Sequence, residues 1–290
     1  MRWLIRLAAA CAVLGSAAAT ADGAAGPALW EIAGERNTVY LFGSVHLLRD
    51  GEFRLEGRVA QAYGDAEAVF LEVDMDDLSR ADMAGTTAAL AMDPQGRGLF
   101  ELMGPDAETA RERAEAAGID LALLAPMEPW FAGLAVVTLA LAKEGYTSGA
   151  GVEQLVLERA AADGKEILGF ETLAEQLSAL DGLDVELQRD FLLKALEDAA
   201  RPNEALAAFL QAWKDGDEQA LAAELASEFE ASPALYESLM VRRNQRWIGQ
   251  IERLLDDDRD YLVIVGALHL AGPDGLPVQL QKRGRAVTRH

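Results

Sequence analysis

Two histidines of this chain sit in the same short pattern, Gly-x-x-His. The pattern occurs at Gly43 to His46 and again at Gly266 to His269, and each copy follows an apolar run typical of a β-strand, "TVYLF" and "YLVIV". The chain has only 3 histidines, and the third, His290, is its last residue and is given no role. Neutral imidazole is a common ligand of divalent metals. The repeat therefore predicts that His46 and His269 bind one metal ion, with histidines buried for structural reasons as the alternative.

Two glutamates close further strand-like runs, Glu72 in "AVFLEVD" and Glu171 in "EILGFET". Ligand sites of α/β proteins form beyond the carboxyl ends of the strands, so we expect both glutamates to converge with the two histidines. Imidazole and carboxylate together suit Zn, Mn, Co or Fe. Such a metal lowers the pKa of a bound water, which a nearby glutamate could then deprotonate as a general base.

Both glutamates also have a simpler interpretation. Three of the five residues after Glu72 are acids, and Thr172 follows Glu171. Each glutamate could therefore be a carboxylate at the start of a helix. Glu72 is our first candidate for a metal ligand or general base, and Glu171 is a second, weaker candidate for a catalytic group.

The glycines of the repeated pattern have a physical reason of their own. Gly43 and Gly266 lack a Cβ atom, so a neighbouring backbone or a bound ligand can approach the strand closely. We therefore predict that both glycines lie beside the cofactor.

A long amphipathic helix, "LYESLMVRRNQRWIGQIERLLDDD", carries the last candidates. Asn244 falls on the apolar stripe that includes Met240 and Trp247, where a buried amide needs hydrogen-bond partners. Arg243 borders the same stripe. Because this helix leads into the strand that precedes His269, both residues could reach the site, with Arg243 stabilising a developing oxyanion. The alternatives are an ordinary helix salt bridge for Arg243 and a local hydrogen bond for Asn244.

Strand-like and helical runs alternate along most of the chain, which is typical of α/β proteins. The runs predict a hairpin from "ALWEIAGERNTVYLFGSVH", later strands from "AEAVFLEVD", "EILGFET", "YLVIVGALHL" and "RAVT", and helices between them. We predict one α/β domain over residues 22–290. It has a mixed central β-sheet built from two related halves, flanking helices, and an all-helical insert at about 184–228.

Residues 1–21 have the features of a secretory signal peptide, because Arg2 and Arg6 precede an apolar run and a series of small residues. We expect a secreted or periplasmic protein, with lipid attachment at Cys11 as the weaker alternative. Cys11 is the only cysteine, so its removal with the signal peptide excludes disulfides and thiolate metal ligands. No later run is long enough for a stable membrane span.

The chain is strongly acidic, with a formal net charge of -22. This charge argues against nucleic acid or an anionic membrane surface as a partner. The expected partner is a peptide or small-molecule substrate. The sequence leaves the oligomeric state open.

After residue 21, most of the chain resembles the TraB/GumN family. The resemblance is carried by "WEI", "LFGSVHLL", "FLEVD", "GVEQLVLERA", "GKEILGFETLAEQLSAL", "RRNQRW" and "VGALHLAGPDGL". The family usually has threonine where Ser44 stands here, which is a mild departure. The resemblance implies that His46 and His269 are metal ligands, that Glu72 is a ligand or base, and that Arg243 contacts the substrate or transition state.

The resemblance also implies a chemistry. The Tiki proteins, animal relatives in this family, are metal-dependent proteases that use Mn or Co, and bacterial members include plasmid pheromone-shutdown proteins. More distant relatives include haem-binding and erythromycin-esterase-like folds. The expected function is a metal-dependent hydrolase that uses Mn, Co or Zn, with a peptidase as the first choice. The alternative is a protein that sequesters a peptide, pheromone or haem-like ligand without turnover.

Overall fold

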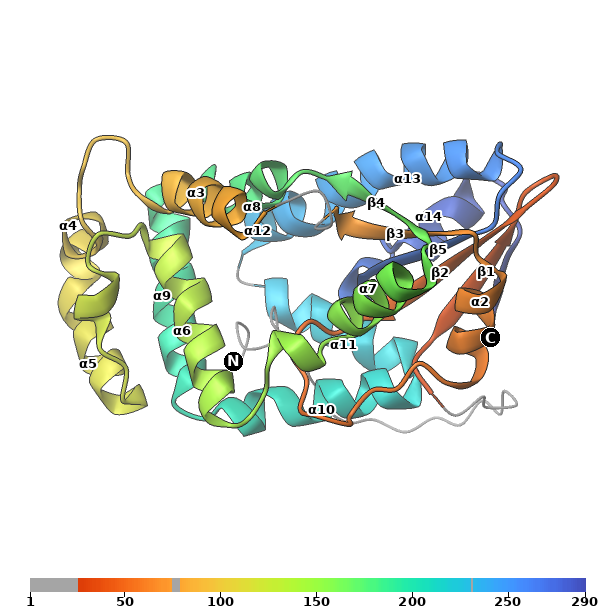
Figure 1. Ribbon diagram of the computed structural model, residues 1–290. Coiled ribbons are helices and arrows are strands. Elements are labelled where there is room, and N and C mark those ends of the chain that lie inside the picture. The colour runs from red at the N-terminus through yellow and green to blue at the C-terminus, as the bar shows by residue number, and fades with distance from the viewer. Residues whose placement is uncertain (1–25, 75–78, 231) are drawn as a thin grey trace.

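The computed structural model describes residues 26–74, 79–230 and 232–290. The predicted signal peptide, with Cys11, lies outside the described residues. Figure 1 shows a β-sheet with its covering helices at one end of the molecule and a group of helices at the other end.

Six strands form one mixed sheet. They are β1 (Leu29–Ala33), β2 (Thr38–Ser44), β3 (Ala68–Val73), β4 (Glu166–Glu171), β5 (Tyr261–Gly266) and β6 (Val287–Arg289). The strand order is β4-β3-β5-β2-β1-β6. Strands β4, β3, β5 and β2 run parallel, whereas β1 pairs antiparallel with both β2 and β6. The predicted α/β class with a mixed central sheet is confirmed, and the predicted hairpin is the β1–β2 pair.

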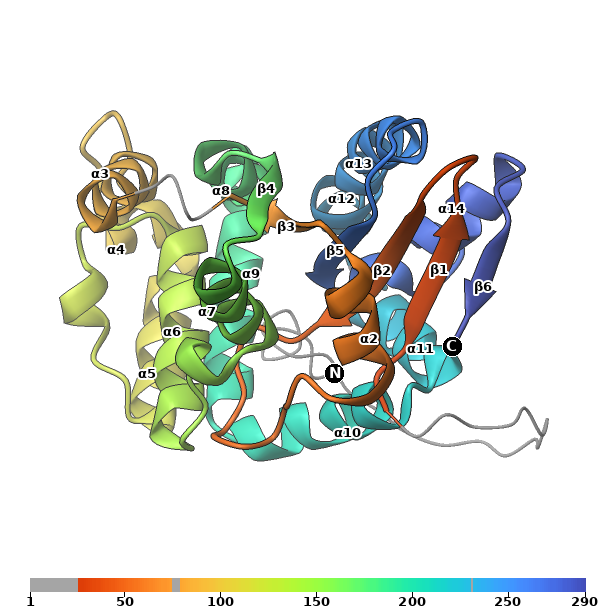
Figure 2. The same ribbon diagram turned by 45° about the vertical axis from the view of Figure 1, so that its right-hand side comes forward.

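Helices cover both faces of the sheet (Figure 2). One face carries α13 (Arg242–Leu255) and α14 (Leu276–Lys282), and the other carries α2 (Gly57–Asp65) and α7 (Val152–Asp163). Alternate residues of β5 enter the two cores, with Val263 on the α13 face and Ile264 on the α7 face. Because both faces are covered, β5 is apolar throughout, as the sequence indicated.

The remaining helices lie beside the sheet or run beneath it (Figure 1). They are α3 (Arg80–Ala91), α4 (Leu99–Met103), η1 (Gly104–Asp106), α5 (Ala107–Ala117), η2 (Leu121–Leu124), α6 (Pro129–Lys143), η3 (Ser148–Ala150), α8 (Leu173–Asp181), α9 (Val185–Ala199), α10 (Pro202–Asp215), α11 (Glu218–Phe229) and α12 (Pro233–Tyr236). Residues 184–228 fall mostly in α9, α10 and α11. Their separation as an insert, and the relation between two halves of the domain, stay predictions.

Helices α6 and α9 pack closely because Gly133 has no side chain. A Cβ atom at Gly133 would lie 2.5 Å from the ring of Phe191. The apolar stretch around α6 is thus accounted for by packing. Within the described part of the chain, no helix has both the length and the apolar character that a membrane span needs.

Two sequence-based boundaries are wrong. Strand β2 ends at Ser44 and β5 at Gly266, so His46 and His269 follow the strands instead of ending them. His269 lies in a 3-10 turn, η5 (Ala267–Leu270), because the chain must turn away from the sheet before the next helix. The helix predicted as one piece consists of α12, a π-helical turn, η4 (Glu237–Val241), and α13.

Candidate functional site

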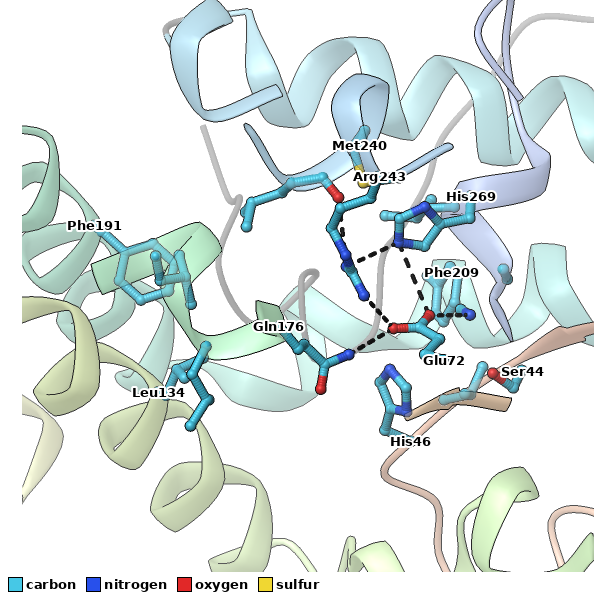
Figure 3. Close-up of a pocket in the computed structure, with 17 residues that line it drawn as sticks. Ser44, His46, Glu72, Leu134, Gln176, Phe191, Phe209, Met240, Arg243 and His269 are labelled. Atoms are coloured by element: carbon cyan, nitrogen blue, oxygen red, sulfur yellow. Dashed lines mark hydrogen bonds and ion pairs between the residues drawn. The ribbon is translucent and has the colours of Figure 1, made fainter. Parts of the chain in front are cut away.

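A pocket of about 340 Å³ lies where β2, β3 and β5 end. Its lining includes Gly266 and the polar residues Ser44, His46, Glu72, Gln176, Arg243 and His269. Figure 3 shows the polar side chains together on one side, with Leu134 and Phe191 across the opening. The ends of parallel strands are the expected place for a ligand site in an α/β fold.

His269 is buried, and Asn244 fixes the orientation of its ring. The Asn244 side-chain amide donates from Nδ2 to the carbonyl oxygens of His269, at 3.1 Å, and Asp274, at 2.9 Å. Its Oδ1, which can only accept, therefore faces His269 Nδ1 at 2.6 Å. This assignment puts the ring proton on Nδ1 and leaves the Nε2 lone pair on the pocket side.

The imidazole of His269 is neutral. Burial, assisted by the positive charge of Arg243, lowers the pKa of His269 to about 3. The approach of His269 Nε2 to Glu72 Oε1, at 3.8 Å, is therefore a contact between a neutral ring and a carboxylate, not an ion pair. A neutral imidazole with its Nδ1 bonded to a fixed group is the form that binds metals.

His46 is held by Glu153, the second residue of α7. His46 Nδ1 lies 2.7 Å from Glu153 Oε1, and the hydroxyl of Ser44 donates to the same oxygen. The negative charge of Glu153 raises the pKa of His46. The His46 side chain is 48% exposed, so solvent screens part of this effect. As in His269, Nδ1 is engaged and Nε2 is left for another partner.

Glu72 is buried, and three donors fix its carboxylate. The backbone N–H of Gly266 donates to Oε1 at 2.7 Å, while Gln176 Nε2 and Arg243 Nη2 donate to Oε2 at 2.8 Å and 2.6 Å. Burial opposes the charged form, but Arg243, the two histidines and the N–H of Gly266 together outweigh it and hold the pKa of Glu72 below its usual range. Glu72 is thus an ionised carboxylate in a fixed orientation.

Arg243 links the polar groups of the pocket to a second carboxylate behind it. Its Nη1 lies 3.1 Å from His269 Nε2, and its Nε donates to Glu171 Oε2 at 3.0 Å. Burial opposes the charge of Arg243, but Glu72 and Glu171 together raise its pKa. The ion pairs of Arg243 reach β3 and β4 and not its own helix, so the ordinary helix salt bridge considered above is wrong.

The two glycines of the repeated pattern differ in their surroundings. A Cβ atom at Gly266 would lie 3.3 Å from Glu72 Oε1 and 3.7 Å from both His46 Nε2 and His269 Cδ2. A Cβ atom at Gly43 would instead lie 3.1 Å from the Cα of Ala267. Gly266 therefore keeps space free between the three candidate ligands, whereas Gly43 lets the turn after β5 approach β2.

The donors for a metal ion are near one another but are not assembled around one point. Within the described residues, no three His, Cys, Asp or Glu side chains form a group that could already hold a metal. The chemistry of His46 Nε2, His269 Nε2 and Glu72 Oε1 nevertheless fits Mn, Co or Zn. Since Arg243 lies against His269 Nε2 and Glu72 in this structure, its guanidinium would have to move before all three donors could share an ion.

The structure brings most of the predicted site residues together. Those that line the pocket are His46, Glu72, Arg243, Gly266 and His269. Asn244 and Glu171 lie behind them, bonded to His269 and Arg243 respectively, and Gly43 lies outside the pocket. Glu153 and Gln176 were not predicted. The sequence feature that could have pointed to them is their place near the start of a helix. Glu153 follows the N-cap residue Gly151, and Gln176 follows the N-cap residue Thr172.

Gly151 lets the start of α7 lie against the backbone of His46, which brings Glu153 to the His46 ring. Replacement of Gly151 by alanine tests this close approach. A Cβ atom there would lie 2.1 Å from the backbone oxygen of His46, and backbone cannot yield as a flexible side chain can. We expect Gly151→Ala to lower the free energy of unfolding by about 1–3 kcal/mol, measured by urea denaturation. Gly149→Ala in the same turn is the control, because the nearest atom to its Cβ is 3.9 Å away. Equal losses in the two variants would contradict the close approach.

Comparison with known proteins agrees with the resemblance seen in the sequence. Residues 28–289, which include both Gly-x-x-His patterns, match the profile of the TraB/PrgY/gumN family. The chain is also similar to the uncharacterized protein YbaP of Escherichia coli (strain K12), with 25% identity over 246 residues that cover 83% of this chain and 87% of that protein. YbaP of Shigella flexneri matches to the same extent. The chain belongs to the TraB/PrgY/gumN family.

Proposed function

We propose that this protein is a metal-dependent hydrolase, with a peptide as its substrate, that acts in the periplasm or outside the cell after removal of residues 1–21. One observation carries the proposal. His46 and His269 each bond Nδ1 to a fixed partner, which turns Nε2 toward the polar end of the pocket, where Glu72 adds a carboxylate oxygen beside Gly266. Histidines that bind metals are commonly oriented in this way.

The three donors of this proposed metal centre are His46 Nε2, His269 Nε2 and Glu72 Oε1. A bound Mn, Co or Zn ion supplies Lewis acidity and lowers the pKa of a coordinated water. Glu72 accepts three hydrogen bonds, which suits a fixed ligand better than a general base that must gain and lose a proton. Asn244 sets the tautomer of His269, and Glu153 orients His46.

Arg243 is the group best suited to bind a developing negative charge. It is a buried cation whose Nη1 and Nη2 both point to the polar end of the pocket. A charged donor beside the reacting group stabilises a developing oxyanion. Glu171 does not line the pocket, and its role in this scheme is to hold Arg243 in place.

The first test is the metal content of the protein. The mature chain, purified without chelator, is expected to contain close to one equivalent of Mn, Co or Zn by mass spectrometry. The His46→Ala/His269→Ala variant is expected to contain little, because two of three donors are gone. Circular dichroism checks that the variant is folded. Undiminished metal in a folded double variant would contradict the proposed centre.

A second candidate function is the binding of a peptide, pheromone or haem-like ligand without turnover. It is favoured by the contacts of Arg243, since the guanidinium already satisfies His269 Nε2 and Glu72 Oε2 without a metal. If neither protein contains metal or takes it up when Mn, Co or Zn is supplied, this candidate replaces the hydrolase.

A further inference from the structure

The pocket has a large apolar part that the proposed hydrolysis does not use. We call it the apolar chamber, and its residues are Leu134, Leu177, Leu180, Phe191, Phe209, Leu239, Met240 and Leu268. We propose that the apolar chamber binds a large apolar side chain of a peptide substrate, next to the peptide bond that lies at the polar end. This inference rests on the proposed function and adds the substrate's side-chain class to it.

The apolar chamber is built like a binding site. Its side chains come from several helices, α6, α8, α9 and α10, and from the turn η4, so it is not a gap between two poorly matched elements. Leu134 and Leu177 are only partly buried even though they belong to this apolar wall. Ligand sites are typically apolar hollows with a few convergent polar groups, and Figure 3 shows this division between Phe191 and Leu134 on one side and Glu72 and Arg243 on the other.

The size of the pocket fits the proposed side chain. An apolar cavity of about 150 Å³ in another protein is large enough to bind benzene. The volume here, about 340 Å³, holds a phenyl or isobutyl group and leaves room for the adjoining backbone. An alanine side chain would leave most of the chamber without contacts, so large apolar residues should be preferred.

A second hollow shows where the rest of the peptide would lie. It has a volume of about 510 Å³ and shares His46, Leu134 and Phe191 with the first pocket. Its other lining residues are Leu47, Val137, Thr138, Ala142, Tyr146, Thr147 and Ser148, a mixture of apolar and hydroxyl side chains. Because the two hollows meet at His46, a chain can continue past the polar groups, with its apolar side chain in the chamber and further residues in the second hollow.

Binding can be measured without turnover by displacement of a dye. The probe is 8-anilinonaphthalene-1-sulfonate, whose fluorescence rises in apolar pockets. The competitors are acetyl-Ala-Ala-Phe-Ala-Ala-amide and the same peptide with Ala in place of Phe. On the wild type we expect the Phe peptide to displace the dye at a concentration about 10-fold to 100-fold lower, because burial of the phenyl ring adds affinity.

Matched variants test whether the advantage of the Phe peptide arises in the apolar chamber. Leu134→Trp fills the apolar chamber and should abolish the advantage of the Phe peptide. Leu139→Trp lies on the same helix α6 at a residue that is 46% exposed and should leave the advantage unchanged. If Leu134→Trp does not fold by circular dichroism, Leu177→Trp, which fills the chamber from α8, takes its place. An equal displacement by the two peptides on the wild type, or an advantage that survives the filled chamber, would overturn the inference.

Cleavage of a random peptide library, supplied with Mn, Co or Zn, separates this inference from the proposed function. Cleavage next to Leu, Met or Phe supports both. Cleavage with no apolar preference supports the hydrolase and overturns the apolar chamber as a specificity site. A Phe-dependent displacement without any cleavage supports the chamber as a peptide site and overturns the hydrolase.

Discussion

Replacement of Arg243 by methionine is expected to lower the free energy of unfolding by about 3–5 kcal/mol. The guanidinium is buried between the carboxylates of Glu72 and Glu171, at 2.6 Å and 3.0 Å. Methionine retains most of the volume but leaves Glu72 buried without an opposite charge, whereas Glu171 keeps only Arg246. Urea denaturation followed by circular dichroism measures the loss.

The neighbouring arginine is a matched control for this prediction. The Arg242 side chain is 65% exposed, and it pairs with Glu237 at 3.3 Å. Exposed pairs contribute about 0–1 kcal/mol, so Arg242→Met should have a small effect. A loss in Arg243→Met no larger than that of Arg242→Met would show that the charge is not buried as described.

A combined variant separates lost charge from lost packing. Arg243 also stacks on Trp247, with the guanidinium carbon 4.6 Å from the ring centroid. When Glu72→Gln and Glu171→Gln are added to Arg243→Met, no unpaired buried charge remains, and much of the lost stability should return. A loss that persists in the triple variant would assign the effect to packing against Trp247.

If Mn, Co or Zn binds as proposed, replacement of Gly266 by valine is expected to weaken that binding by roughly 100-fold or more. Loss of a group that only supports a metal ligand typically weakens binding by about 10- to 100-fold. The new side chain would occupy the space between Glu72 Oε1, His46 Nε2 and His269. The backbone of Gly266, with φ -50 and ψ 135, accepts any L-residue, so the fold should persist. Calorimetric titration of the metal-free protein with Mn²⁺ or Co²⁺ measures the affinity.

Two further glycine variants test whether the loss of affinity depends on the space beside Gly266. Gly266→Ala adds only the Cβ atom and should have an intermediate effect. Gly249→Ala, on α13, has no heavy atom within 4 Å of the added Cβ and should bind metal as the wild type does. Unchanged affinity in a folded Gly266→Val would place the metal elsewhere.

The sequence predicted the pocket residues that depend on local patterns. His46, Glu72 and His269 each lie at or just after the end of an apolar strand, and parallel strands bring such ends to one edge of a sheet. Arg243 and Asn244 were found because a buried helix stripe does not normally contain polar residues. These arguments use only neighbours in the sequence and the alternation of strand and helix.

The remaining contacts depend on the order of the strands, which no local pattern specifies. Glu171 does end a strand, as predicted, but β4 is at the edge of the sheet. The carboxylate of Glu171 therefore binds Arg243 and Arg246 outside the pocket. Glu153 meets His46 only because the first turn of α7 passes beside the end of β2. Its partner is more than a hundred residues earlier, and its position at a helix start resembles an ordinary acidic cap.

The place of β5 in the sheet has a consequence for the folding of the protein. Strand β5 lies between β3 and β2, although its hydrogen-bonded partner in β2 is far away in sequence, with Val39 opposite Tyr261. Without residues 261–266, the pairs β1–β2 and β3–β4 have no strand to join them. Contacts between such distant segments form late in folding. A chain truncated before β5 therefore has neither a continuous sheet nor a pocket, and the two histidines meet only when β5 has entered the sheet.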